Sequence, residues 1–347
     1  MQRILACPEL PTLPTIAVQV LEMTRDPDVG LPQIARLVQN DTGLSTKFLR
    51  TVNSSFVGLS QPCAAIDRAL GLLGMSTVTS LVLGFSLLDC TKDIESAEGF
   101  SLPQYWRRVV YGATAARHFA RLFDRCDPDE VFTAGLFQDM GMLTAHVALG
   151  PEYDKVIASA PRVHTALVDV ERRALGFTHA EVGAELGRRW HLPESIVACI
   201  EHHHAPDEAP APVADLVRLV ALGRMAAQSM SEETPGLELR DLLSWSNAWF
   251  DHTVENVDDM NEVFESVAEA AQDLSKVFNR DIGALPDVTS IMSDARDALV
   301  THQLRMAQET EHLRIASMTD QLTGVGNRKK FNSTLDSCFE ATRSGAT

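Results

Sequence analysis

Residues 134–144, with the sequence AGLFQDMGMLT, constrain the fold more than any other part of the chain. Apolar side chains recur there at helical spacing, at Leu136, Phe137, Met140 and Leu143. Asp139 lies in the middle, so we expect it to project from a helix that is otherwise mostly core. A buried carboxylate is costly unless it is paired. Asp139 is therefore expected either to face a polar pocket or to hold a buried network together.

The composition, with 45% hydrophobic and 22% charged residues, is typical of a folded globular protein. Lys plus Arg total 30 and Asp plus Glu total 47, a net charge of −17 that opposes binding to nucleic acid or anionic lipid. No apolar run reaches the roughly 18 residues needed to span a bilayer, and the N-terminus lacks a signal-peptide pattern. We therefore expect a cytoplasmic protein with neither a membrane nor a nucleic-acid partner.

Six cysteines are scattered without any C-x-x-C pair. This spacing indicates thiols in a reducing compartment, and neither disulfides nor a cysteine zinc site.

Helical periodicity runs through the chain, and strand alternation is hard to find before residue 318, so we predict an all-α fold. Residues 31–39 and 44–52 form two short helices that could be a DNA-binding helix-turn-helix, but their place in a helical bundle suits the acidic chain better. Residues 64–73 and 77–88 are two further helices, hinged at Gly74.

Several motifs follow one another in the first part of the chain. They are an LPxLP-like opening at residues 10–14, a DPDxxLxxIARLVxxD-like helix pair at 26–41, an ANSxxxG-like segment at 52–58 and an LLG segment at 72–74. Motifs in this order resemble those of the HDOD family, and the resemblance extends to about residue 228. The resemblance implies a multi-helix bundle like that of the HD phosphohydrolases over residues 1–228, with residues 229–287 as a helical extension packed on it.

HD phosphohydrolases hold one or two divalent metals with histidines and aspartates, and the metal activates a bound water. Carried over position by position, the first His falls on Arg108, the His-Asp pair on Gln138 and Asp139, the following Lys on Met142, and the last Asp near Gly223. Arginine repels a dication, glutamine is a poor ligand and glycine offers none. Of these positions, only Asp139 keeps a residue that can bind the metal. We therefore expect no metal, no cofactor and no catalytic residue.

The resemblance leaves a remnant pocket that is polar except for Met142: Arg108, Gln138, Asp139, Met142, His179, His203 and His204. We expect Asp139 to pair with Arg108 or His179, in a network that is structural or binds a regulatory ligand. His179 could equally be a satisfied core histidine. Residues 202–204 look like a metal tract, but neighbours on a helix point about 100° apart and cannot all face one ion.

A continuous helix without Pro or Gly is predicted from Val288 to Met318. Its apolar residues Met292, Leu299, Met306 and Leu313 fall seven apart, as in the a positions of a coiled coil. The d positions are weak: Ala295, His302, Glu309 and Ala316. Residues 288–317 are therefore either a dimerising signalling helix or a single helix that lies on its own domain.

Residues 317–331, SMTDQLTGVGNRKKF, resemble the DxLTGxxNR signature that begins GGDEF domains. The matching residues are Asp320, Leu322, Thr323, Gly324, Asn327 and Arg328. The GG(D/E)EF loop and its metal-binding aspartate do not follow, so residues 318–347 resemble the N-terminal fragment of a diguanylate cyclase domain. The resemblance implies GTP and Mg²⁺ only for the missing part.

The sequence thus predicts a non-catalytic regulatory module of a cyclic di-GMP signalling protein. It would control a C-terminal cyclase domain through a homodimer, in response to a small-molecule or protein regulator. The alternatives are a metal-dependent HD-type phosphohydrolase, a nucleic-acid-binding module, and a protein-docking scaffold without a ligand.

Overall fold

A computed structural model describes residues 1–347 except 27, 55, 56, 58, 60, 161–163, 231–234, 252–256, 320–324 and 344–347. The α-helices are α1 (Gln2–Leu5), α2 (Thr15–Met23), α3 (Leu31–Asn40), α4 (Thr42–Val52), α5 (Ile66–Cys90), α6 (Leu102–Leu122), α7 (Pro128–Phe137), α8 (Met140–Leu149), α9 (Pro151–Ser159), α10 (His164–Leu175), α11 (His179–Arg189), α12 (Glu194–His202), α13 (Ala214–Ser229), α14 (Pro235–Phe250), α15 (Val257–Phe278), α16 (Val288–Met318) and α17 (Arg328–Arg343). Short 3-10 turns at Pro206–Glu208 and Ala211–Val213 join α12 to α13. Among the described residues there is no β-strand, which confirms the all-α prediction.

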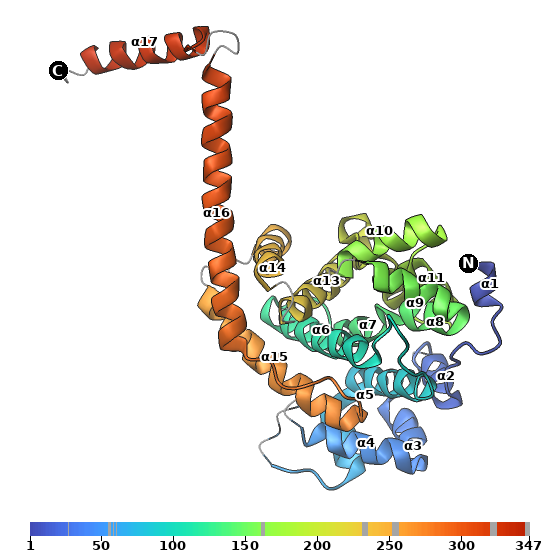
Figure 1. Cartoon of the computed structure of the whole chain (residues 1–347). Helices are drawn as coiled ribbons and strands as arrows, with labels where there is room; N and C mark the ends of the chain where they lie inside the picture. The colour runs from blue at the N-terminus through green and yellow to red at the C-terminus, as the bar shows by residue number, and fades with distance from the viewer. Residues whose placement is uncertain are drawn as a thin grey trace. The chain divides into compact units, whose positions relative to one another are not determined.

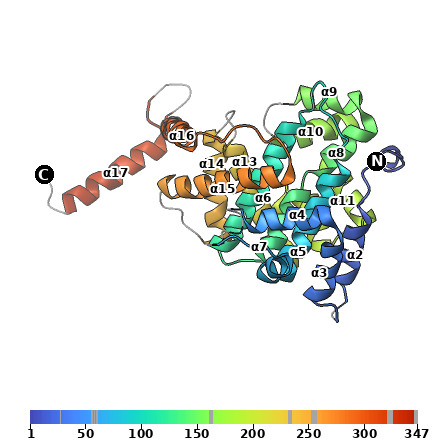
Figure 2. The same ribbon diagram turned by 90° about the horizontal axis from the view of Figure 1, so that it is seen from below.

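The chain divides into two compact units, Met1–Asp294 and Ala295–Thr347. In the first unit, α6 and α7 lie at the centre of the bundle, and α6 packs on α13, α7 and α15 (Figures 1 and 2). On one side, α8 packs against α11, and α11 against α12. This arrangement brings the α7–α8 turn and the ends of α11 and α12 together.

Local sequence signals begin the helices that carry the polar residues. Ser101 accepts a hydrogen bond from the Gln104 N–H at the start of α6, and Asp127 accepts one from the Asp129 N–H at the start of α7. Thr178 and Glu181 form a capping box that begins α11 at His179. The first residue of α11 is thereby held in place by its own neighbours.

The predicted hinge at Gly74 is confirmed, because the backbone has φ 76° there and the long α5 is kinked. Only a glycine adopts this conformation without strain. The expectation that no segment could span a bilayer needs correction, since α5 is long and apolar enough by length and composition. That stretch is 61% buried inside the bundle, as the core helix of a folded protein would be.

Candidate metal centre

Asp139 lies in the turn between α7 and α8, and not inside one continuous helix as the periodicity predicted. Helix α7 ends at Phe137, and Asp139 precedes the first residue of α8 with φ −99° and ψ 10°. Its carboxylate makes no capping bond to α8. The side chain is fully buried, so both oxygens face partners from other helices.

One carboxylate oxygen of Asp139 is paired with Arg108 of α6, one of the two partners expected from the sequence. The Arg108 Nε donates to Oδ2 at 3.0 Å, and its guanidinium also approaches the Met142 sulfur at 3.0 Å. The Arg108 side chain is 20% exposed, whereas Asp139 is buried. The pair therefore connects the buried carboxylate to the edge of the bundle.

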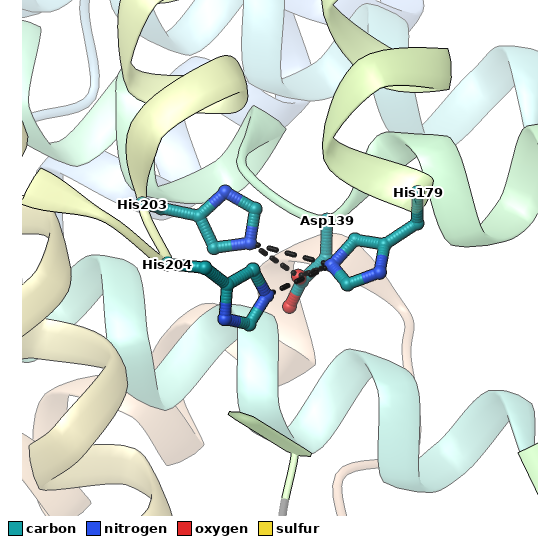
Figure 3. Close-up of side chains that lie close together, drawn as sticks. All are labelled: Asp139, His179, His203 and His204. Atoms are coloured by element: carbon teal, nitrogen blue, oxygen red, sulfur yellow. Dashed lines mark hydrogen bonds and ion pairs between the residues drawn. The ribbon is translucent and has the colours of Figure 1, made fainter. Parts of the chain in front are cut away.

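The other oxygen of Asp139 faces three histidines (Figure 3). His203 Nε2 lies 3.3 Å and His179 Nε2 lies 3.5 Å from Oδ1. His179 Nε2 is in turn 3.4 Å from His203 Nε2 and 3.0 Å from His204 Nε2. Three ring nitrogens and one carboxylate oxygen thus converge on the same point.

Helical spacing predicts that residues 202–204 cannot all face one ion, and His202 does lie outside the cluster, but His203 and His204 converge although they are neighbours. Helix α12 ends at His202, so His203 and His204 lie in the turn that follows and are not bound by helical spacing. Pro206, two residues after His204, is the sequence signal for that ending. His202 itself is absent from the cluster.

The four groups have the geometry of a metal site. The ligand atoms of Asp139, His179, His203 and His204 all lie within 4.8 Å of one another. Tetrahedral coordination with bonds of about 2.0–2.1 Å places ligand atoms about 3.3 Å apart. The four distances above fall between 3.0 and 3.5 Å. Four of the six ligand-to-ligand distances thus match a tetrahedral site, and the other two are within 4.8 Å, so the residues present could hold one transition-metal ion.

A second layer of hydrogen bonds orients two of the rings. His179 Nδ1 is 2.8 Å from a carboxylate oxygen of Glu171, which also accepts the His179 backbone N–H at 2.9 Å. Tyr153 donates its hydroxyl to the other Glu171 oxygen at 2.5 Å. His203 Nδ1 is 2.9 Å from the carbonyl of Ile200. Such partners leave Nε2 as the atom turned to a metal.

Burial and charge act in opposite directions on these groups. Burial disfavours protonated His179, but the Glu171 and Asp139 carboxylates outweigh it and raise the His179 pKa to about 9. Burial lowers the pKa of His203. Burial also opposes the charged form of Glu171, yet His179 lowers its pKa. Without a metal, His179 therefore holds the proton that a metal ion would displace.

The family follows from the sequence. The family model for the HDOD domain matches residues 10–206. The chain belongs to the HDOD family. An uncharacterized protein of Treponema pallidum is 28% identical over 244 residues, which are 68% of this chain and 46% of that protein. The HDOD chain thus spans about half the length of this curated relative.

Solved structures show the same fold. An HDOD domain protein of unknown function from Geobacter sulfurreducens matches with a TM-score of 0.64 and 22% identity, over 77% of this chain and 93% of that one. A candidate phosphohydrolase from Shewanella amazonensis matches with a TM-score of 0.60 and 23% identity, over 80% and 97%. A candidate signal transduction protein from Marinobacter aquaeolei matches at 0.60 and 19%, over 78% and 60%.

This HDOD domain departs from a two-metal site at defined positions. Gln138 is fully buried, and neither atom of its amide has a hydrogen-bond partner among the described residues. Gly223 lies where α13 crosses α6, and a Cβ there would be 2.3 Å from the Gly112 carbonyl oxygen. That contact leaves no room for a side chain at residue 223. Arg108 occupies the remaining oxygen of Asp139.

The other residues singled out from the sequence lie elsewhere. In the second unit, Asn327 donates its amide to the Ser317 carbonyl, and its side-chain oxygen accepts the N–H groups of Lys329 and Lys330 that begin α17. Arg328 is the first residue of α17. Four motif residues lie outside the described residues: Asp320, Leu322, Thr323 and Gly324.

The predicted stalk residues have unequal environments. Met292 is buried, while Met306 is 46% and Leu313 is 71% exposed; the side chain of Leu299 lies outside the described residues. Sequence reasoning missed Glu171 and Tyr153, which no motif marks, because their contact with His179 depends on how α9, α10 and α11 fold together.

Proposed function

We propose that this HDOD domain is a regulatory domain that holds one divalent transition-metal ion and does not hydrolyse phosphate esters. The observation that carries the proposal is the closed set of four ligands, Asp139, His179, His203 and His204. Three imidazoles and one carboxylate suit Zn²⁺ and similar ions.

The closed ligand set argues against hydrolysis. A catalytic zinc site has three protein ligands and keeps the fourth position for water or substrate, whereas a structural site uses four. Here four side chains already converge. The Arg108 guanidinium lies on the other oxygen of Asp139 and repels a second dication.

A bound ion would tie three parts of the domain together. Its ligands come from the α7–α8 turn, the first residue of α11 and the turn after α12. Metal occupancy would therefore change how firmly α11 and α12 are held against α8. The metal-bound and metal-free forms would then be two states of the regulatory domain, and the metal available in its surroundings would set their populations.

We further propose that the output is a diguanylate cyclase domain that follows α16, so that the domain acts in cyclic di-GMP signalling. The GGDEF-like motif after α16 supports this assignment. Phe331, Leu335 and Phe339 support it too, because they lie four residues apart on one face of α17 and are 44–69% exposed. An apolar face of this kind requires a covering partner.

Metal analysis of protein purified without chelator tests the site. We expect about one transition-metal ion per chain, as one four-ligand site requires. His204→Ala should lower the metal content strongly. The control is His202→Ala, which removes the histidine just before the cluster and should leave the metal content unchanged. A metal content that is negligible, or equally reduced by both variants, would contradict the proposal.

The cyclase assignment has a separate test. Sequencing the gene beyond Thr347 should show an open reading frame that encodes a GG(D/E)EF loop. A stop codon directly after Thr347 would rule the cyclase output out without affecting the metal site.

The second candidate function is a metal-dependent phosphohydrolase. The ligand cluster favours it, as does the structural match with a protein named a candidate phosphohydrolase. Two metal ions per chain, together with metal-dependent turnover of p-nitrophenyl phosphate, would establish this function in place of the regulatory one.

A further inference from the structure

Two buried polar side chains beside the histidine cluster have atoms without a hydrogen-bond partner among the described residues. The Gln138 side chain is fully buried, and neither its amide nitrogen nor its oxygen has a hydrogen-bond partner among the described residues. Arg224 of α13 is only 3% exposed, and its Nε has no partner there either. Its Nη1 donates to Gln228 Oε1 in a long hydrogen bond of 3.4 Å. Buried groups of this kind are costly, so each needs an explanation.

The two groups lie at the same crossing of helices. A Cβ built on Gly112 of α6 would be 3.2 Å from the Gln138 amide nitrogen and 3.6 Å from the Gly223 carbonyl oxygen. Arg224 is the next residue after Gly223, and its charge interacts with those of Asp139 and Arg108. The amide therefore belongs to the residue next to Asp139, and the guanidinium lies within electrostatic range of Asp139 and Arg108.

Two guanidinium groups and one carboxylate meet at this crossing. Arg108 donates to Asp139, and the charge of Arg224 interacts with the charges of Asp139 and Arg108. Glu171 is paired with His179. Glu238 of α14 is the carboxylate that acts most strongly on Arg224, although no ion pair within 4 Å joins them in the described structure. A metal ion in the cluster would add positive charge.

We propose that Arg108, Arg224 and the Gln138 amide bind a phosphate group, either free or carried by a nucleotide, beside the metal cluster. A tetrahedral oxyanion offers acceptors in several directions, which suits donors that arrive from α6, α13 and the α7–α8 turn. Guanidinium groups form strong, charge-assisted hydrogen bonds with phosphate oxygens. The group would enter beside Arg108, whose side chain is 20% exposed while Gln138 and Arg224 are buried.

This inference deepens the proposed function by naming the class of regulatory ligand, and it rests on that proposal for the regulatory role alone. Binding of phosphate by the arginines does not require the metal. The two ideas can therefore fail separately, and metal content is measured in each sample that is tested for phosphate binding.

Isothermal titration of the full chain with inorganic phosphate, at constant ionic strength, tests the site. We expect saturable binding by both metal-loaded and chelator-treated protein. Arg108→Gln and Arg224→Gln should each weaken binding by about tenfold or more, the usual effect of losing a charge-assisted hydrogen bond. The matched control is Arg121→Gln, which makes the same change at an exposed position of α6 and should bind as the wild type does. Titration with GTP shows whether a nucleotide carries the phosphate, since it should then bind more tightly than phosphate alone.

Gln138→Leu separates a binding role from a structural one. It removes an unpartnered buried amide at nearly constant volume, so we expect a higher unfolding temperature without phosphate together with weaker phosphate binding. A structural amide would instead lower the unfolding temperature when replaced. The proposal is overturned if wild-type protein shows no saturable phosphate binding in either metal state, or if both arginine variants bind as tightly as the wild type. Either result leaves the measured metal content, and hence the proposed function, unaffected.

Discussion

Asp139 is the residue on which the buried charges of this domain depend. One of its oxygens faces the Arg108 guanidinium, and the other faces the imidazoles of His179 and His203. The carboxylate itself is not exposed to solvent. Removing one partner of a buried ion pair usually costs more than the pair contributes, because the remaining charge stays buried.

We therefore expect Asp139→Ala to lower the free energy of unfolding of chelator-treated protein by about 3–5 kcal/mol, measured by urea denaturation. The control is Asp169→Ala on the exposed side of α10, which should change it by less than about 0.5 kcal/mol. If Asp139→Ala folds with nearly wild-type stability, the carboxylate serves ligand binding and does not hold the network together.

A buried partner for Asp139 could be predicted from the sequence, because a carboxylate within an apolar segment must be paired. The sequence leaves Arg108 and His179 as alternatives, and the structure shows contacts with both. The convergence of three histidines could not be predicted. It depends on where α12 ends, since a helix one turn longer would separate the rings of His203 and His204. Gln138 was expected as a member of the remnant pocket, but the full burial of its amide could not be predicted, because it follows from the crossing of α6 and α13.

At the scale of helices, the site depends on how closely α8 approaches α11. A Cβ on Gly141 of α8 would lie 1.8 Å from the His179 carbonyl oxygen and 2.7 Å from the Gly183 nitrogen. Only a glycine allows these backbones to touch. Since Asp139 precedes α8 and His179 begins α11, this contact also sets the distance between the two ligands.

Gly141→Ala should therefore push α8 and α11 apart and greatly reduce the metal content, as measured by elemental analysis. We also expect a loss of stability of about 1–3 kcal/mol, the usual cost of overpacking. Gly187→Ala is the control on α11, because its nearest neighbours lie at 3.4–3.5 Å, an ordinary contact. Unchanged metal content in Gly141→Ala would show that the helix spacing is not critical.

Helices α10 and α11 are joined by the pair of Glu171 and His179, and this pair predicts a pH dependence. The pKa of His179 is raised from 6.5 to about 9 in the folded protein. The folded state thus binds a proton that the unfolded state releases. The stabilisation is complete below about pH 6.5 and is lost as the pH rises through about 9.

Urea denaturation of chelator-treated protein between pH 6 and 10 should accordingly show a falling free energy of unfolding. Glu171→Gln should flatten this dependence, because it removes the largest charge that raises the His179 pKa. An unchanged slope in Glu171→Gln would assign the pH dependence to other groups. Metal-loaded protein should respond in the opposite direction, since a ligating imidazole must be neutral.

The helices themselves were largely predictable, whereas one break was not. The kink at Gly74 and the uninterrupted α16 follow from the positions of Gly and Pro. The break between α7 and α8 has no such signal, because apolar residues surround it on both sides and bury the two helices almost completely. Hydrophobic periodicity cannot reveal the end of a helix when the residues on both sides of that end are buried in the core.

At the scale of the whole molecule, the chain consists of two units with different surfaces. The first buries most of the candidate metal cluster and its apolar core, including Ile291 and Met292 at the start of α16. The second leaves large apolar side chains exposed along its two helices and, at Val325, between them: Val300, Leu304, Met306, Leu313, Val325, Phe331, Leu335 and Phe339. Exposed apolar residues in this number favour association with another chain or domain.

Dimerisation through α16 is the form of association that the heptad spacing predicts. Met306 and Leu313 lie seven residues apart and are both exposed, so they would face their counterparts across a parallel dimer. The double variant Met306→Asp/Leu313→Asp would place like charges in that interface. We expect the full chain to shift from dimer to monomer in size-exclusion chromatography with light scattering.

Ala307→Asp is the matched control, since it adds a charge at an exposed position beside the stripe and should leave the dimer intact. The comparison matters for signalling, because a metal site in the first unit can control an output only through an element that both units share. Helix α16 begins in the first unit and continues in the second. If the double variant remains dimeric, the chains associate elsewhere, and α16 would have to transmit the signal as a single helix.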